Sequence, residues 1–142
     1  MEHFACQSGA VEAQRIVDDN SKNEKAKGKK QKTILEGVCI FNDTIVIDKG
    51  MLQFYSDMVK SADGELFKAN LFKVIDLSKT IAEIVYAASN SITILNQAGS
   101  WFTHCDFSGI RIPDANLYKA FFSAANLLQS DLTGCILTSS FL

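Results

Sequence analysis

Residues 100–142 read SWFTH CDFSG IRIPD ANLYK AFFSA ANLLQ SDLTG CILTS SFL when the sequence is written in groups of five. The third position of every group is Phe, Ile or Leu, from Phe102 to Leu142. The first position is small in every group except the one that begins with Ile110. A period of five fits neither the 3.6-residue turn of an α-helix nor the two-residue alternation of a strand. The pattern therefore predicts a repeat whose units pack against one another.

This repeat resembles the pentapeptide-repeat family, whose consensus is a small residue, Asp or Asn, Leu or Phe, and two polar residues. The best matches are Ala115-Asn116-Leu117, Ala125-Asn126-Leu127 and Ser130-Asp131-Leu132. The resemblance implies that residues 100–142 form a short right-handed, quadrilateral parallel β-helix, with one unit per face and 20 residues per coil. The large third residue would then fill the axis, and the small first residue would pack beside it.

A coil of 20 residues places Trp101, Phe121 and Phe141 in one column, at the second position of the first face. That position points outward in the family and holds Asp or Asn in several other units of this chain. An outward column of three aromatic side chains is an apolar strip of the kind that marks an interaction site. We expect it either to bind a partner or a second copy, or to be covered by a helix through Ile84, Ala88 or Ile92.

The same coil length makes two further predictions. Arg111 and Asp131 become neighbours on the third face, about 4.8 Å apart by strand spacing, where an exposed salt bridge would contribute about 0–1 kcal/mol. The last coil, Ser130 to Leu142, is followed by no capping segment in this sequence. Unpaired strand edges template further pairing, so we expect end-to-end dimerisation or poor solubility through that coil.

Residues 33–99 are predicted to form a helical connector unit of about four helices. Thr33-Ile34-Leu35-Glu36 is a capping box that would open a short first helix. Asp48 is placed to cap a second helix, in which Leu52, Tyr55 and Val59 fall on one face.

The last two predicted helices are also delimited by their terminal residues. Asp63-Gly64 would begin the third helix, and Thr80-Ile81-Ala82-Glu83 is a second capping box that would open the fourth. The fourth helix carries an apolar stripe that includes Ile84, Ala88 and Ile92, and Gly99 is placed to end it. With the repeat, these helices predict an α+β protein.

Residues 1–32 are predicted to be a flexible, Lys-rich arm. The stretch from Lys22 to Lys32 holds six lysines and one glutamate, and no aromatic residue that could stack on bases. A charged run of this kind is typical of a solvated linker, so no nucleic-acid partner is expected.

Part of the helical region has a second resemblance. Leu52-Gln53-Phe54 with Asp57, the stretch 87–95, and Ile110-Arg111-Ile112-Pro113 are similar to the segment that precedes pentapeptide repeats in large NACHT-type signalling NTPases. The sequence contains no G-x-x-x-x-G-K-[ST] phosphate-binding motif. The resemblance therefore implies a connector and the first coils of a solenoid, without the NTPase activity.

No set of residues in the sequence predicts catalysis. His3 and His104 are the only histidines, and no G-x-S-x-G motif accompanies the serines. Cys105 and Cys135 both occupy first, inward positions of the repeat and lie one and a half coils apart, so a shared metal site is not expected. We expect no enzyme activity, no cofactor, no metal and no small-molecule substrate.

Length and composition bound the location and the class of protein. The 142 residues carry a net charge of −2, and no apolar run reaches the roughly 18 residues of a membrane span. The N-terminus lacks the pattern of a signal peptide. We therefore expect a cytoplasmic protein with four reduced cysteines and no membrane contact.

These observations favour a non-catalytic scaffold or protein-interaction module that binds a protein partner or itself. An alternative is a truncated or split fragment of a signalling NTPase that acts in assembly or regulation. A DNA-mimic topoisomerase inhibitor is disfavoured, because that role needs a long, strongly acidic rod.

Overall fold

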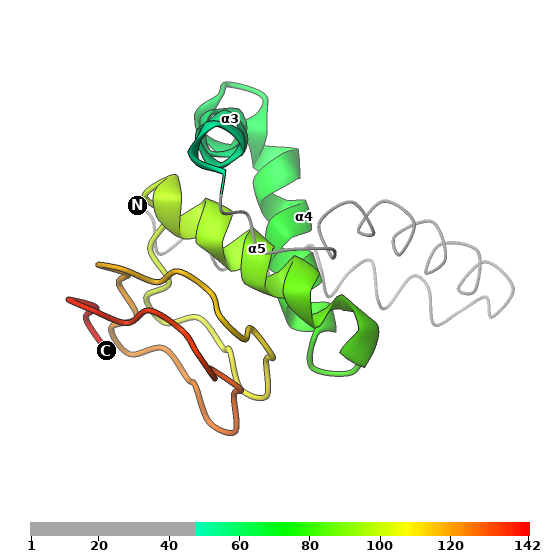
Figure 1. The fold of residues 1–142 in the computed structure, drawn as a ribbon, viewed down its shortest axis with the longest axis vertical. Helices are drawn as coiled ribbons and strands as arrows, with labels where there is room; N and C mark the ends of the chain where they lie inside the picture. The colour runs from blue at the N-terminus through cyan, green and yellow to red at the C-terminus, as the bar shows by residue number, and fades with distance from the viewer. Residues whose placement is uncertain (1–47) are drawn as a thin grey trace, which may run out of the picture.

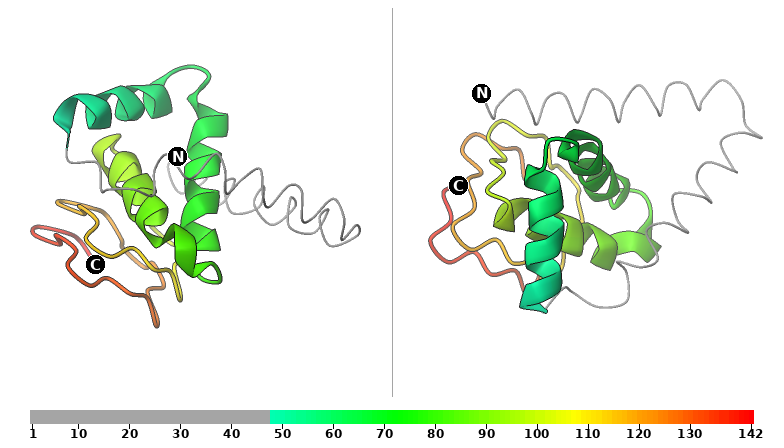
Figure 2. Two further views of the ribbon diagram at one scale, coloured as in Figure 1. Left: turned by 45° about the vertical axis from the view of Figure 1, so that its right-hand side comes forward. Right: turned by 90° about the horizontal axis from the view of Figure 1, so that it is seen from above.

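The computed structural model describes residues 48–142, which form three α-helices followed by the repeat region, whose chain winds into successive coils (Figure 1). The helices are α3 (Lys49–Lys60), α4 (Gly64–Leu77) and α5 (Val85–Gln97), and a 3-10 turn, η2 (Ala82–Ile84), precedes α5. The predicted Lys-rich arm and the capping box at Thr33 lie outside the described residues. The views in Figures 1 and 2 place α5 in the middle, with α3 and α4 on one side and the coil on the other.

The boundaries of α3 and α4 confirm the sequence prediction. One carboxylate oxygen of Asp48 accepts hydrogen bonds from the N–H groups of Gly50 (2.7 Å) and Met51 (3.0 Å), which caps α3. Helix α4 begins at Gly64. A Cβ atom there would lie 2.4 Å from the carbonyl oxygen of Val59. Only glycine allows the two helices to approach so closely.

The predicted capping box at Thr80 is wrong. The N–H of Thr80 donates to the carbonyl of Leu77 (3.1 Å) and its hydroxyl points back to the same carbonyl (3.4 Å). Thr80 therefore continues the C-terminal turn of α4, and the chain passes through η2 before α5 begins at Val85.

The C-terminus of α5 follows the prediction. Gly99 has φ +79°, and its N–H donates to the carbonyl of Asn96 (3.0 Å). The next residue, Ser100, donates to the carbonyl of Leu95 (3.0 Å). These two bonds form a Schellman motif, in which glycine takes the left-handed conformation at low cost.

Helix α5 is buried on all sides, whereas the sequence predicted a single apolar stripe. Every residue from Ala87 to Leu95 is buried, including four polar ones. Three of the polar side chains bond within the helix, because the hydroxyls of Ser89 (3.0 Å), Ser91 (2.7 Å) and Thr93 (2.7 Å) donate to the carbonyls four residues earlier. The central position of α5 between two layers explains why it has no exposed face in this stretch.

The predicted 20-residue coil is confirmed. Four parallel backbone bridges each join residues 20 positions apart, and they pair Asp106 with Asn126, Arg111 with Asp131, Asn116 with Ile136, and Phe121 with Phe141. The first and third positions of the first coil point inward and are buried, as Phe102, Ala115 and Leu117 illustrate at 0% exposure.

The predicted strands do not form in the part of the chain that the structure describes. Each unit contributes one bridging residue, because its other residues make a corner. At each corner the N–H of a first-position residue donates to the carbonyl three residues earlier, as from Ala125 to Phe122 (2.8 Å). The fifth-position residue has a positive φ in all eight complete units: His104, Gly109, Asp114, Lys119, Ala124, Gln129, Gly134 and Ser139. A corner every five residues gives each coil four faces.

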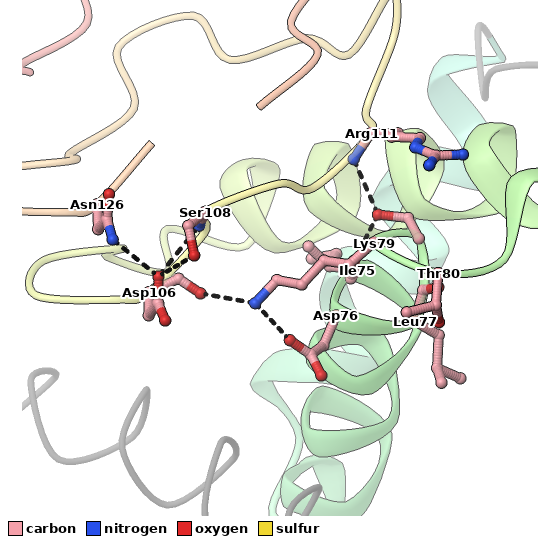
Figure 3. Close-up of polar contacts among 10 residues, drawn as sticks. Ile75, Asp76, Leu77, Lys79, Thr80, Asp106, Ser108, Arg111 and Asn126 are labelled. Carbon is pink, nitrogen blue, oxygen red and sulfur yellow. Dashed lines mark hydrogen bonds and ion pairs between the residues drawn. The ribbon is translucent and has the colours of Figure 1, made fainter. Parts of the chain in front are cut away.

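In the first coil, helix side chains form the backbone hydrogen bonds that a preceding coil would otherwise form. In the second coil, second-position N–H groups donate to carbonyls of the first coil, as from Ile136 to Ala115 (3.0 Å). In the first coil, the corresponding N–H of Arg111 donates to the hydroxyl of Ser78 (3.0 Å, Figure 3). The N–H of Asn116 donates to the hydroxyl of Thr93 (3.0 Å).

Carbonyl groups on the edge of the first coil that faces the helices are also hydrogen-bonded by helix side chains. The side-chain amide of Asn96 donates to the carbonyls of Asn116 (3.3 Å) and Tyr118 (3.0 Å). The ammonium of Lys79 reaches the carbonyl of Asp106 (3.4 Å, Figure 3) and also pairs with Asp76 (2.8 Å). The helical layer thus satisfies backbone groups that would otherwise be buried without partners.

The corner geometry predicts the effect of Ala124→Gly. An L-residue in the left-handed region costs about 1–2 kcal/mol, part of which the greater chain entropy of glycine offsets. We expect this substitution to stabilise the protein by about 0.5–1 kcal/mol in urea unfolding. The neighbouring Ala125→Gly is the control. Ala125 lies at an inward first position, so this substitution should destabilise the protein. Equal effects of the two substitutions would contradict the corner assignment.

The helix–coil contact predicts the effect of Thr93→Val. Valine keeps the shape but leaves the N–H of Asn116 without its acceptor, which costs about 1–3 kcal/mol. The matched control is Thr138→Val, since Thr138 is exposed and should change stability by less than about 0.5 kcal/mol. Thermal unfolding of the three proteins measures the difference, and similar midpoints would argue against the contact.

Candidate interaction face of the coil

The three aromatic residues predicted as an interaction surface do lie in one column. The ring centroids of Trp101 and Phe121 are 5.3 Å apart, and those of Phe121 and Phe141 are 4.8 Å apart with nearly parallel planes (4°). Their exposed fractions are 47%, 37% and 55%, respectively.

The described helices do not fully cover this aromatic column. The helix side chains considered as its cover, Ile84, Ala88 and Ile92, are all buried. All three rings nevertheless stay partly exposed. The column therefore forms an accessible apolar strip on the first face.

In the four units with Asp or Asn at the second position, that side chain accepts hydrogen bonds from its own unit. Asp106 accepts hydrogen bonds from the N–H (3.1 Å) and the hydroxyl (2.7 Å) of Ser108, two residues later. Asp131 binds the N–H (3.0 Å) and hydroxyl (2.5 Å) of Thr133 in the same way. Asn116 and Asn126 each accept from the N–H two residues later, both at 3.1 Å. A short polar side chain at the second position therefore accepts a hydrogen bond from the N–H of the fourth position.

The first face is built differently. Trp101 and Phe121 have no acceptor atom to offer, and the N–H groups of Thr103 and Ser123 have no hydrogen-bond partner among the described residues. The third face avoids the same problem, because Arg111 is followed by Pro113, which has no N–H. The aromatic column thus replaces a local hydrogen bond with exposed apolar surface.

The predicted salt bridge between Arg111 and Asp131 is wrong. The two residues are bridged neighbours, but within residues 48–142 no ion pair joins them at 4 Å or less. The hydrogen bond from the Thr133 hydroxyl is the main cause that lowers the pKa of Asp131, and the nearby charge of Arg111 contributes less. The carboxylate is therefore held by its own unit.

Asp106 is held in a similar way, as Figure 3 shows. The hydroxyl and N–H of Ser108 are the largest causes that lower its pKa, and Lys79 and Asn126 add to them. The side-chain amide of Asn126 donates to Asp106 across the coils (3.2 Å).

Across residues 48–142, no group of three or more metal-ligating side chains comes together. Cys135 is a free thiol that donates to the carbonyl of Ile112 (3.0 Å), and burial raises its pKa. Cys105 is disulfide-bonded with a partner that is not among the described residues, so the expectation of reduced cysteines is wrong for Cys105.

Comparison with known proteins identifies the class of the coil. Residues 100–138 match the family model for pentapeptide repeats, with eight copies. The C-terminal part of the chain is therefore a pentapeptide-repeat array, as predicted, and proteins with such arrays are generally non-catalytic. Searches of curated proteins and of solved structures gave no match. The family model does not extend over the helices, so their resemblance to NACHT-associated connectors stays a prediction.

Of the helices in the described part of the chain, none is both long enough and apolar enough to cross a membrane.

The held carboxylates predict how stability depends on pH. Because the pKa values of Asp106 and Asp131 are lowered by folding, the unfolded chain takes up protons first as the pH falls. Their stabilising effect is present above about pH 4 and is lost as the pH falls through the folded-state pKa values. Thr133→Val removes the main donor to Asp131, so the pKa of Asp131 should rise towards its ordinary value.

Carboxyl chemical shifts followed by NMR between about pH 2 and pH 6 measure both pKa values. The pKa of Asp106 serves as the internal control, because Thr133 is not among its causes. Titration of Asp131 at the same pH in wild type and Thr133→Val would contradict the described geometry.

Proposed function

We propose that the protein is a non-catalytic interaction module whose binding surface is the aromatic column Trp101, Phe121 and Phe141. The framework of this surface is a right-handed, four-sided β-solenoid of residues 100–142, which packs against helices α3 to α5. A solenoid of this kind suits a scaffold because each coil adds a firmly held surface layer without a catalytic pocket.

One observation carries the proposal. On the first face, the chain gives up the hydrogen bond that second-position Asp and Asn make elsewhere, and it exposes three aromatic rings instead. Stacking between coils alone would not require this, because Asn126 and Asp106 also bond between coils. Aromatic side chains are enriched among the residues that dominate binding energy at protein interfaces.

The test uses Phe121→Asn, because asparagine occupies the second position in two other units, at Asn116 and Asn126. The new side chain could accept the N–H of Ser123, as Asn126 accepts that of Leu128 (3.1 Å). We expect the variant to fold with a thermal midpoint close to that of wild type, and to lose binding by at least about tenfold.

The matched control is Ile136→Asn, which removes an exposed apolar side chain from the second position of the fourth face. Quantitative affinity capture from native cytosol, with the wild type and both variants as baits, identifies ligands of the column as proteins lost only from Phe121→Asn. Sedimentation velocity of the same three proteins detects a second copy as the ligand. If Phe121→Asn and wild type agree in both measurements, the proposal is wrong.

A further inference from the structure

The aromatic column is accompanied by a second feature, a column of unused hydrogen-bond donors. Thr103 and Ser123 lie one coil apart at the fourth position of the first face. The N–H of each has no partner among the described residues, and each side chain carries a hydroxyl beside that N–H. What these donors bind is inferred on the basis of the proposed function of the column.

The other faces show what such a pair of donors binds. The N–H and hydroxyl of Ser108 hold one oxygen of Asp106 at 3.1 and 2.7 Å, and those of Thr133 hold one oxygen of Asp131 at 3.0 and 2.5 Å. In both cases the hydroxyl is the largest cause that lowers the pKa of the carboxyl group, so the pair favours the charged form. Hydrogen bonds to an ionised acceptor are shorter and stronger than neutral ones.

The first face offers the same donors but no internal acceptor. Its units, residues 100–104, 120–124 and 140–142, contain no Asp or Glu. A carboxylate that arrives from outside would therefore meet two hydrogen-bond donors and no like charge within the units of that face.

We propose that the first face binds an acidic segment of a protein partner. A carboxylate oxygen of that segment accepts from the N–H and hydroxyl of Ser123, and a second can do so at Thr103. An apolar side chain of the same segment packs on the neighbouring rings of Phe121 and Trp101. The partner thus supplies in trans the carboxylate that Asp106 and Asp131 supply within their own units.

The probe is an eight-residue peptide of alternating Asp and Leu, blocked at both ends, and its counterpart of alternating Asn and Leu. Trp101 is the only tryptophan in the chain, so its fluorescence reports binding at the column directly. We expect the acidic peptide to bind at least about tenfold more tightly than the amide peptide, and the difference to shrink as salt is raised.

Ser123→Pro removes both donors of one pair while it keeps the ring of Phe121. The fourth position tolerates proline, since Pro113 occupies it on the third face. We expect this variant to bind the acidic peptide at least about fivefold more weakly and the amide peptide as wild type does. Thr138→Pro is the matched control, because it removes the same groups beside Ile136 on the fourth face. Circular dichroism verifies that each variant is folded, and Ser123→Ala, which removes the hydroxyl alone, replaces Ser123→Pro if that variant is not.

The outcomes separate this inference from the proposed function. Equal affinities for the acidic and amide peptides, or equal losses in Ser123→Pro and Thr138→Pro, would overturn the carboxylate site. The aromatic column would still stand if Phe121→Asn then lost binding of its partner while Ser123→Pro kept it. Loss in Ser123→Pro together with retained binding in the control supports the carboxylate site.

Discussion

The structure depends on hydrogen bonds at the edge where the helices meet the first coil. A parallel coil exposes backbone N–H and C=O groups along its edge, and burying them without partners is costly. Here Ser78 and Thr93 accept from the N–H groups, and Asn96 and Lys79 donate to the carbonyls. The helical layer can therefore cover the apolar interior of the first coil. A helix face with only apolar side chains could not, because it would leave these backbone groups without hydrogen bonds.

That contact also determines which surfaces of the coil are left open. The helices bind the edge of the first coil through residues of its second, third and fourth faces. Within residues 48–142, no hydrogen bond joins a helix to the aromatic column of the first face, and its rings stay partly exposed. The same edge that anchors the coil thus leaves the first face accessible.

The sequence predicted the coil well because its signal is local and repeated. Third-position residues such as Phe102 and Leu117 are large in every unit, which reveals the period of five. The coil length of 20 residues came from the resemblance to pentapeptide repeats, and the column Trp101, Phe121 and Phe141 follows from that length. The absence of longer strands could have been expected from the five-residue unit. Most of its residues form the corner, which leaves a single residue for the bridge to the next coil.

The remaining features depend on side-chain choices that spacing does not determine. Asp131 accepts hydrogen bonds from the N–H and hydroxyl of Thr133 in its own unit, and within residues 48–142 no ion pair joins it to Arg111. Thr80 is the first residue of a capping-box sequence, but its N–H donates to the carbonyl of Leu77 in the turn that ends α4. The role of Thr93 could not be predicted, because its partner Asn116 is 23 residues away and belongs to a different layer.

The central claim is that the edge of the first coil is paired by the helices while the first face keeps unpaired donors. Amide hydrogen exchange of the full chain, resolved residue by residue by NMR, tests both halves together. The account predicts slow exchange for the N–H groups of Arg111 and Asn116, comparable to that of Ile136, and fast exchange for Thr103 and Ser123. Fast exchange at Arg111 and Asn116, or protection at Thr103 and Ser123 in the absence of a ligand, would contradict it.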